Sequence, residues 1–434
     1  MTNNKLSLQP YKGTRDFYPK DFELQKYLFD IYREVCLSYG YEEYLAPLIE
    51  NFDLYAAKTG EEIVNNELYS FTDRGNRKVA IRPEMTPSVA RMIASRIQEI
   101  PKPIRWFSIA NFMRNEAPQR GRLREFWQLN LDMFGVQSIE AELEMIEISR
   151  DIFTKLGATT EMYECRVNNR QLLNAVFKKL GLVDEDKQIY KVSKAIDKKN
   201  KISSEDFEQM LTDANCNPTQ ISQIKEYLEC TIEDLDKFVD KDEIGYQDLM
   251  TFFELLKLDG RNSFVKFSPG LMRGFDYYTG MVFEFFDIDQ TNRRSLFGGG
   301  RYDDLISIFN GQSLPAIGIA PGEVPMLDFM EVHNLVPKLK NSTNVLITLM
   351  DINTKSYSLD TAKLLRAKGL NVATYLTMDK LEKQLKYASQ KEIKYVVIAG
   401  QIEMEKHTLK IKNLEDRSEK EIKIEEIEDL NLIL

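Results

Sequence analysis

The sequence predicts an α+β protein in which a helical insertion interrupts a sheet-and-helix domain and a separate α/β domain follows. Three observations predict this. Helix-like and strand-like blocks alternate through the first 160 residues, polar helical periodicity dominates residues 170–257, and strands alternate with helices after residue 343. We expect one domain over 1–330, a linker over 331–343 and a second domain over 344–434.

The first 160 residues show local signals for helices, strands and turns. Leu28, Ile31 and Val35 recur at helical spacing, and Gly40 follows as a stop. The whole stretch predicts a helix over 21–39, an extended segment over 41–50, a hairpin with strands 68–72 and 78–82, a helix over 87–100, strands 104–109 and 129–134, and a helix over 140–156.

Residues 170–257 differ in composition, because Lys, Asp, Glu and Gln dominate and Gly is rare. This helical insertion is either a surface module that packs over something large or simple spacer bulk. Strand-like segments then return at 264–267, 281–286, 296–301 and 316–319. The run Gly298–Gly300 marks a close approach of backbone, to a ligand or to a structural bulge.

The last part of the chain follows a polar, turn-rich boundary and alternates strands with helices. It predicts strands over 344–349, 371–376 and 394–400, helices over 358–368 and 378–392, then two short strands and a final helix. This order favours an α/β domain with parallel pairing.

The composition argues against several classes of protein and of binding site. The net charge of −10 gives no global signal for nucleic acid, so any RNA contact uses local patches. The four cysteines are scattered without a CxxC motif and imply neither disulfides nor a zinc site. No signal segment and no long apolar run is visible, so we expect a cytoplasmic protein without a membrane partner.

Histidine is scarce, since only His333 and His407 occur and both lie far from the motif-rich regions. A Ser-His-Asp or Cys-His catalyst and a histidine-ligated metal are therefore disfavoured. Chemistry must come from carboxylates, arginines, tyrosines and backbone groups.

Residues 111–135 form the most informative segment, a basic loop between two strand-like ends. Guanidinium groups bind phosphate bidentately and keep their charge. Interleaved acidic, amide and aromatic residues favour a nucleotide over a bare phosphate, although a solvated basic hairpin is an equal alternative from this segment alone. The residues concerned are Arg114, Glu116, Arg120, Arg122, Arg124, Phe126, Trp127 and Gln128.

Several motifs together resemble the histidyl-tRNA synthetase family of class II aminoacyl-tRNA synthetases. They are KGTRDFYP (12–19), FTDRGNRKVAIRPEMT (71–86), the basic hairpin, LMRGFDYYTGMVFEF (271–285) and FGGGRYDDL (297–305). The resemblance covers nearly the whole chain, and RGFDYYTG is its most specific element. It implies a class II antiparallel sheet flanked by helices, with a C-terminal anticodon-binding domain.

The resemblance also implies a histidine site. Glu84 and Asp132 are expected to hold the ammonium group, and Thr86 and Gln128 to fix neighbouring polar atoms. The full set of expected histidine contacts is Glu84, Met85, Thr86, Gln128, Asp132, Arg273, Tyr277, Tyr278 and Tyr302.

The implied reaction joins histidine to tRNA(His) through a histidyl-adenylate, with ATP as substrate and Mg²⁺ on its outer phosphates. Arg114 and Arg273 are the expected catalytic residues, facing the α-phosphate from two sides. Glu116 is expected to contact adenine, Phe126 to stack on it, and Arg122 to reach the outer phosphates.

The chain departs from the family pattern in two places. Aligned without gaps from Ala316, the usual glutamate and arginine of class II motif 3 are Ala320 and Pro321. Arg293, Arg294 and Arg301 are candidates to replace the arginine. In addition, Ala117 stands where many bacterial members carry an arginine.

The expected partners are L-histidine, ATP, tRNA(His) and a second copy of the chain, the homodimer being implied by the resemblance alone. One alternative is a non-catalytic histidine-sensing relative, the regulatory subunit of ATP phosphoribosyltransferase. Another is a synthetase-derived RNA-binding module. The retained arginines and C-terminal domain argue against the first, and no extra domain is visible for the second.

Overall fold

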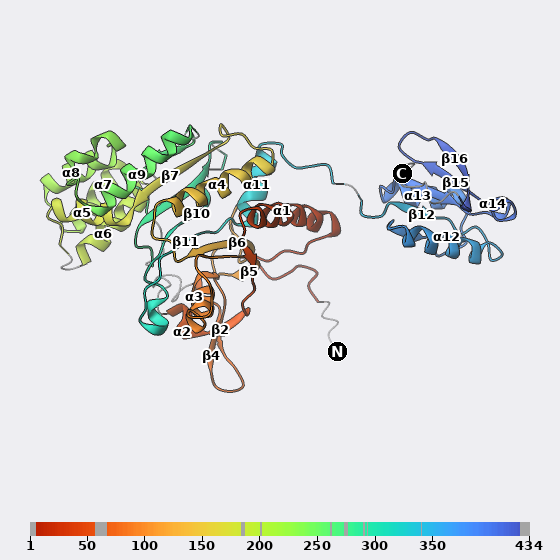
Figure 1. Ribbon diagram of the computed structural model, residues 1–434, viewed down its shortest axis with the longest axis horizontal. Coiled ribbons are helices and arrows are strands. Elements are labelled where there is room, and N and C mark those ends of the chain that lie inside the picture. Colours follow the sequence, from red (N-terminus) through yellow and green to blue (C-terminus); the bar gives the residue numbers. More distant parts are fainter. Residues whose placement is uncertain are drawn as a thin grey trace. The chain divides into compact units, whose positions relative to one another are not determined.

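The computed structural model describes residues 6–56, 67–183, 187–199, 202–260, 263–272, 277–289, 291–292, 294–339 and 341–425. The chain divides into two compact units, residues 1–336 and 337–434 (Figure 1). Within the described ranges, no helix combines the length and apolar character needed to cross a membrane.

An eight-stranded sheet organises the first unit, in the order β1-β5-β6-β11-β10-β9-β7-β8. The pairs β1–β5 and β7–β8 are parallel, and every other neighbouring pair is antiparallel. The sheet is therefore mainly antiparallel, as predicted. Its strands are β1 (Glu42–Glu43), β5 (Ile104–Met113), β6 (Glu125–Phe134), β7 (Tyr163–Asn169), β8 (Val265–Phe267), β9 (Met281–Asp287), β10 (Ser295–Arg301) and β11 (Ala316–Ile319).

The basic segment joins β5 and β6, which pair without a break from Ile104↔Phe134 to Met113↔Glu125. Both strands are longer than predicted, because residues 110–113 and 125–128 continue the ladder. Side chains alternate between the two faces of a strand. Leu129, Leu131 and Met133 of β6 accordingly enter the main apolar core.

Helices cover both faces of this sheet (Figure 1). Apolar side chains of α1, α4 and α11 share the main core with Leu131 and Phe285 of the strands. A smaller cluster on the other face joins Val89 and Ile93 of α3 to Phe134 and Tyr302. The helices are α1 (Pro19–Ser38), α3 (Thr86–Ser95), α4 (Glu140–Lys155), α10 (Ser307–Asn310) and α11 (Glu323–Val332). Thus α3 ends five residues earlier than the predicted helix over 87–100.

The predicted hairpin is present as part of a small antiparallel sheet in the order β2-β4-β3. Asp73 closes its turn, accepting hydrogen bonds from the backbone of Gly75 and Arg77 at 2.9 Å each. The elements are β2 (Ile49–Asn51), α2 (Phe52–Ala56), β3 (Ser70–Thr72) and β4 (Lys78–Ile81).

The segment after β7 is helical, as predicted, and its helices gather in one bundle beside β7, drawn in green in Figure 1. Asn169 caps the first helix by accepting from the backbone of Gln171 and Leu172. The bundle contains α5 (Arg170–Lys179), α6 (Gln188–Lys198), α7 (Ser204–Asp213), α8 (Pro218–Leu228), a short 3₁₀ helix (Ile232–Lys237) and α9 (Ile244–Asp259).

The second unit is an α/β domain with a five-stranded sheet in the order β13-β12-β14-β15-β16. The first three strands are parallel, as predicted, but β15 and β16 pair antiparallel. A short helix, α14, was not predicted, and the predicted final helix lies mostly outside the described residues. The elements are β12 (Val345–Ile347), α12 (Lys355–Ala367), β13 (Val372–Thr374), α13 (Leu381–Gln390), β14 (Tyr395–Ile398), α14 (Gln401–Lys406), β15 (Thr408–Asn413) and β16 (Glu419–Lys423).

Candidate active site

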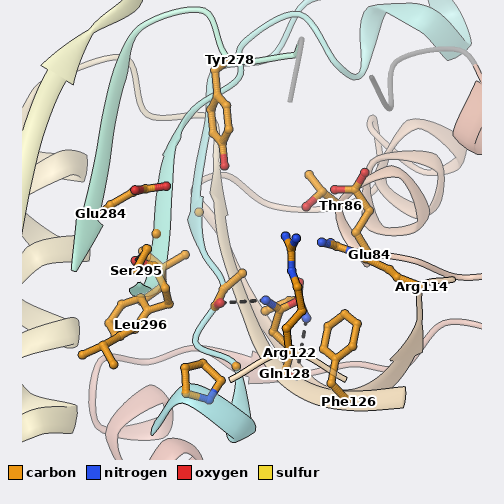
Figure 2. Close-up of a pocket in the computed structure, with 18 of the residues that line it drawn as sticks. Glu84, Thr86, Arg114, Arg122, Phe126, Gln128, Tyr278, Glu284, Ser295 and Leu296 are labelled. Atoms are coloured by element: carbon orange, nitrogen blue, oxygen red, sulfur yellow. Dashed lines mark hydrogen bonds between the residues drawn. The ribbon is translucent and has the colours of Figure 1, made fainter. Parts of the chain in front are cut away.

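A cavity of about 1050 Å³ opens over one face of the large sheet. Strand alternation places Phe126, Gln128, Asn130 and Asp132 of β6 along it, opposite the side chains that enter the main core. Figure 2 shows Glu84, Thr86 and Tyr278 toward one end and Phe126 and Gln128 toward the other. The cavity therefore has a carboxylate end and an arginine end.

Two buried carboxylates define the carboxylate end, and each is held by a tyrosine. The Tyr277 hydroxyl donates to Glu84 Oε2 at 2.9 Å, and the Tyr302 hydroxyl donates to Asp132 Oδ1. The rings of Tyr277 and Tyr302 meet edge to face, with centroids 5.6 Å apart. Tyr278 packs against Tyr277 at 4.9 Å. Aromatic walls and negative charge are thus combined in one small space.

Asp132 has a raised pKa at this end of the cavity. Burial raises its pKa to about 7, the Tyr302 hydrogen bond lowers it, and the neighbouring Glu84 raises it further. Its Oδ2 atom is buried and has no hydrogen-bond partner among the described residues. A buried acceptor of this kind suits a cationic ligand group, which would satisfy the oxygen and favour its charge.

Glycines keep the carboxylate end open and let the strands approach. A Cβ on Gly318 would lie 2.5 Å from Asp132 Oδ1, and one on Gly300 would lie 2.9 Å from the Tyr278 ring. A Cβ on Gly299 would instead lie 2.1 Å from the carbonyl oxygen of Gly318 on the next strand. The glycine run therefore serves both strand packing and the shape of the cavity, the two readings that the sequence left open.

The arginine end is formed by Arg114, Arg122, Glu116 and Phe126. Arg122 Nε lies 2.5 Å from Glu116 Oε2, and Arg114 Nη1 lies 3.9 Å from Glu116 Oε1. The Arg114 guanidinium also covers the Phe126 ring at 5.3 Å and donates to the carbonyl of Pro83 at 3.0 Å. Two cations beside one aromatic face can hold a phosphate chain and a base.

Glu67 also lines this end and was missed from the sequence, because nothing in its local pattern marks it. Its pKa is raised to about 7, first by burial and then by the neighbouring Glu116 carboxylate. The two carboxylates therefore lie close together, with Arg122 beside them.

The structure separates the four arginines of the basic loop. Arg114 and Arg122 line the cavity, whereas Arg120 and Arg124 do not. Arg120 is mostly exposed, 3.9 Å from Asp328, and Arg124 donates to the Tyr11 hydroxyl at 2.8 Å. Two of the four arginines can therefore contact a ligand in the cavity, and the other two cannot.

Most of the predicted histidine contacts meet at the cavity, with two qualifications. The side chain of Met85 is fully buried against Ala46, Ala110 and Phe112 and does not line the cavity. Its apolar thioether is stabilised by that packing rather than by exposure to a polar ligand. Arg273, the predicted catalytic arginine, lies outside the described residues.

None of the described candidates for the missing motif 3 arginine reaches the cavity. Arg301 is buried in a bidentate ion pair with Glu142, at 2.5 and 2.7 Å, and donates to the carbonyl of Val136 at 2.9 Å. The proposal that Arg301 contacts ATP is therefore wrong, because its hydrogen bonds fasten β10 to α4. Arg294 is exposed and does not line the cavity, and Arg293 lies outside the described residues.

The structure also describes the segment at motif 3, in which Ala320 and Pro321 stand at the expected glutamate and arginine positions. A buried glutamate is present, but it is Glu323, the first residue of α11, three positions after Ala320. Glu323 pairs with Arg15 of the KGTRDFYP motif. The loop before α11 is tied to β6, since Gln128 Nε2 donates to the Ala320 carbonyl at 2.8 Å and the Leu129 amide to that of Pro321 at 2.9 Å.

The helical insertion contributes one face of α6 to the cavity rim, so it is not simple spacer bulk. The lining residues from this region are Arg170 of α5 and, at helical spacing along α6 and its N-cap, Lys187, Tyr190, Ser193, Lys194 and Asp197. Asn130, Glu284 and Ser295 also line the cavity and were not predicted. Only Asn130 carried a usable signal, since it lies two residues from both Gln128 and Asp132 on one strand.

Comparison with known proteins identifies relatives of the whole chain. A family model described as histidyl-tRNA synthetase matches residues 13–322, and one described as anticodon binding domain matches residues 344–430. A histidine–tRNA ligase of Leptospira biflexa is 43% identical over 420 residues, 96% of each chain. One of Haloarcula marismortui is 36% identical, covering 93% of each. The crystal structure of histidyl-tRNA synthetase from Nostoc sp. PCC 7120 has the same fold, with a TM-score of 0.83 at 23% identity over 99% of this chain and all of that one.

Proposed function

The chain belongs to the histidyl-tRNA synthetase family, and we propose that its cavity binds histidine at the carboxylate end and ATP at the arginine end. As a member of that family it ligates histidine to tRNA, with ATP as a substrate. The observation that carries the proposal is the single cavity that joins Asp132 and Glu84 to Arg114 and Arg122. Such an arrangement can hold a cationic and an anionic reactant side by side.

At the carboxylate end, Asp132 and Glu84 accept hydrogen bonds from the ammonium group of histidine. The buried, unpartnered Oδ2 of Asp132 supports this role. Tyr277, Tyr278 and Tyr302 surround the imidazole, while Thr86 and, from the side of the arginine end, Gln128 bind neighbouring polar atoms. A site that pairs both ring nitrogens rejects analogues that lack them, because its own buried polar groups would remain unpaired.

At the arginine end, Arg114 binds the α-phosphate, Arg122 the outer phosphates and Phe126 the adenine ring, with Glu116 at the adenine edge. In the structure Arg122 is paired with Glu116. ATP binding therefore exchanges a carboxylate partner of Arg122 for phosphate oxygens. Because Arg114 is held by the Pro83 carbonyl, it needs little reorganisation to meet the substrate.

The first chemical step needs no protein nucleophile. A carboxylate oxygen of histidine attacks the α-phosphorus, the new O–P bond forms as the bond to the β-phosphate oxygen breaks, and pyrophosphate leaves. A terminal ribose hydroxyl of tRNA(His) then attacks the acyl carbon and AMP leaves. Catalysis is positioning and charge stabilisation, to which we assign Arg114 and Arg273.

Mg²⁺ enters this scheme as the counter-ion of the ATP substrate. Within the described residues, no group of three or more His, Cys, Asp or Glu side chains is arranged to hold a metal. In this scheme the protein binds the phosphate chain through its arginines, and Mg²⁺ carried by ATP would supply charge neutralisation on the outer phosphates.

Three further assignments belong to this proposal. The catalytic domain spans residues 1–330, the linker 331–343 and the anticodon-binding domain 344–434. The chain acts as a cytoplasmic homodimer. The dimer is supported by four exposed apolar side chains on or just before strands of the small sheet, which are Leu45, Leu48, Ile49 and Phe71.

ATP–pyrophosphate exchange measured with each of the twenty amino acids tests the proposal. Exchange with histidine alone is expected. Loss of exchange in Arg273→Ala, with histidine binding kept, is expected for a catalytic arginine. A protein that binds histidine but exchanges with no amino acid would instead have the histidine-sensing role.

A further inference from the structure

The first turn of α11 forms part of the cavity wall where this chain lacks the motif 3 arginine. Gly322, Val324 and Pro325 line the cavity together with Phe126. Val324 and Pro325 cannot donate a side-chain hydrogen bond to a nucleotide. Their contribution to ATP binding is shape, so it depends on how accurately this turn is held.

Glu323 holds the turn against β6. Its side chain is fully buried, Oε1 pairs with a guanidinium nitrogen of Arg15, and Oε2 accepts from the Trp127 amide at 3.3 Å. Gln128 and Leu129 add hydrogen bonds to the two carbonyls just before α11. Three consecutive residues of β6 are thus fastened to the residues that lead into the turn.

The carboxylate of Glu323 needs a counter-charge to remain in this position. Burial raises its pKa, and the nearby Arg15 charge and hydrogen bond oppose that rise. A buried charge that loses its partner either takes up a proton or moves toward water. Arg15 is in turn oriented by the Phe17 ring, 4.7 Å from its guanidinium carbon, and about a third of its side chain is exposed.

We propose that Arg15 is a positioning residue for ATP, which fixes the first turn of α11 through Glu323 and so shapes the wall beside the nucleotide. The inference rests on the proposed ATP site at the arginine end. Arg15 does not touch ATP, since it does not line the cavity. By holding this turn in place, Arg15 positions ATP indirectly, whereas an arginine on α11 would position it by direct contact.

Pyrophosphate exchange at varied ATP and varied histidine tests this role. Arg15→Ala is expected to raise KM for ATP roughly 10- to 100-fold, the cost of a misplaced substrate wall, and to change KM for histidine by less than about 3-fold. Arg15→Lys, which keeps the charge, is expected to recover part of the loss.

Arg105→Ala is the matched control. Arg105 also pairs with a glutamate, Glu144 at 2.9 Å, and its side chain is 31% exposed against 32% for Arg15. Neither Arg105 nor Glu144 lines the cavity. This variant is expected to leave both KM values unchanged, although it breaks an ion pair in the same unit.

A double-mutant cycle with Glu323→Gln separates positioning from general damage. The glutamine keeps an acceptor for the Trp127 amide and removes the buried charge, so Arg15→Ala should have little further effect in that background. If Arg15→Ala alone does not fold, the double variant can still be measured, because it contains no uncompensated buried charge.

Three results would overturn the inference: an unchanged KM for ATP in Arg15→Ala, an equal rise in both KM values, or additive effects of the two substitutions. Absence of histidine-dependent exchange in the unmodified protein would instead defeat the proposed function, independently of Arg15.

Discussion

Tyr302 donates a hydrogen bond to Asp132 at the carboxylate end of the cavity, joining the loop after β10 to β6. This bond lowers the pKa of Asp132, whereas burial raises it to about 7. The pKa of this acid therefore lies near neutral pH. The charge of Asp132, and hence its attraction for an ammonium group, depends on a hydroxyl from the loop after β10.

Histidine affinity should fall as the pH drops below about 7, because protonated Asp132 cannot accept from the ammonium group in its charged form. The loss should approach about tenfold per pH unit. The dissociation constant, measured by calorimetry between pH 5.5 and 8.5, checks this. Free imidazole also titrates near pH 6.5, so Tyr302→Phe is the control. It should shift the midpoint upward; an unchanged midpoint would assign the titration to the ligand.

Asp132→Asn should make the protein more stable at pH 8 while abolishing histidine binding. The folded-state pKa is raised, so the unfolded chain loses this proton between about pH 4 and 7 while the folded chain keeps it. Stability thus falls as pH rises through that window, and asparagine removes the cost. The free energy of unfolding in urea should rise by roughly 1–3 kcal/mol at pH 8 and by less at pH 5. A less stable variant at pH 8 would contradict the prediction.

Arg122→Ala should raise KM for ATP by roughly 10- to 100-fold, the worth of one charge-assisted hydrogen bond to phosphate. Histidine binding should not change, because Arg122 lies at the arginine end. Arg120→Ala is the matched control, since Arg120 belongs to the same loop but does not line the cavity. Equal effects of both substitutions on exchange kinetics would show that the loop acts through its total charge.

Gly318→Ala should weaken histidine binding at least tenfold. The added Cβ would lie 2.5 Å from Asp132 Oδ1 and 2.8 Å from the Leu131 carbonyl oxygen, so Asp132 must move. Overpacking of this kind also costs about 1–3 kcal/mol of stability. Gly270→Ala is the control, because its Cβ would meet two side chains at ordinary contact distances, Leu228 at 3.4 Å and Ile196 at 3.8 Å. Calorimetric titration of both variants with histidine measures the two affinities and tests this prediction.

Truncation after residue 340 should preserve pyrophosphate exchange and reduce tRNA charging by about 100-fold or more, since one of two RNA contacts is removed. The basis is the division of the chain into units 1–336 and 337–434, each with its own apolar clusters. Charging is measured with labelled histidine and tRNA. Charging equal to that of the full chain would defeat the anticodon-binding assignment.

The elements predicted best are those whose signals are local. Turn residues and the spacing of apolar residues predict the hairpin around Asp73, the strand Ala316–Ile319 and the insertion helices. Element ends were predicted less well, because pairing partners decide them. The ladder of β5 and β6 continues four residues beyond the predicted strand on each side, and the partner strand of β15 could not be predicted from alternation alone.

The sequence by itself determined the family and the two ends of the site, because motif residues such as Glu84, Arg114 and Tyr277 carry chemistry that depends on residue type. Tertiary structure alone decided which residues meet. It buried Met85 in an apolar cluster, engaged Arg301 with Glu142 and brought Arg15 to Glu323, 308 positions away. Long-range contacts of this kind follow from strand order and helix packing, which no local pattern encodes.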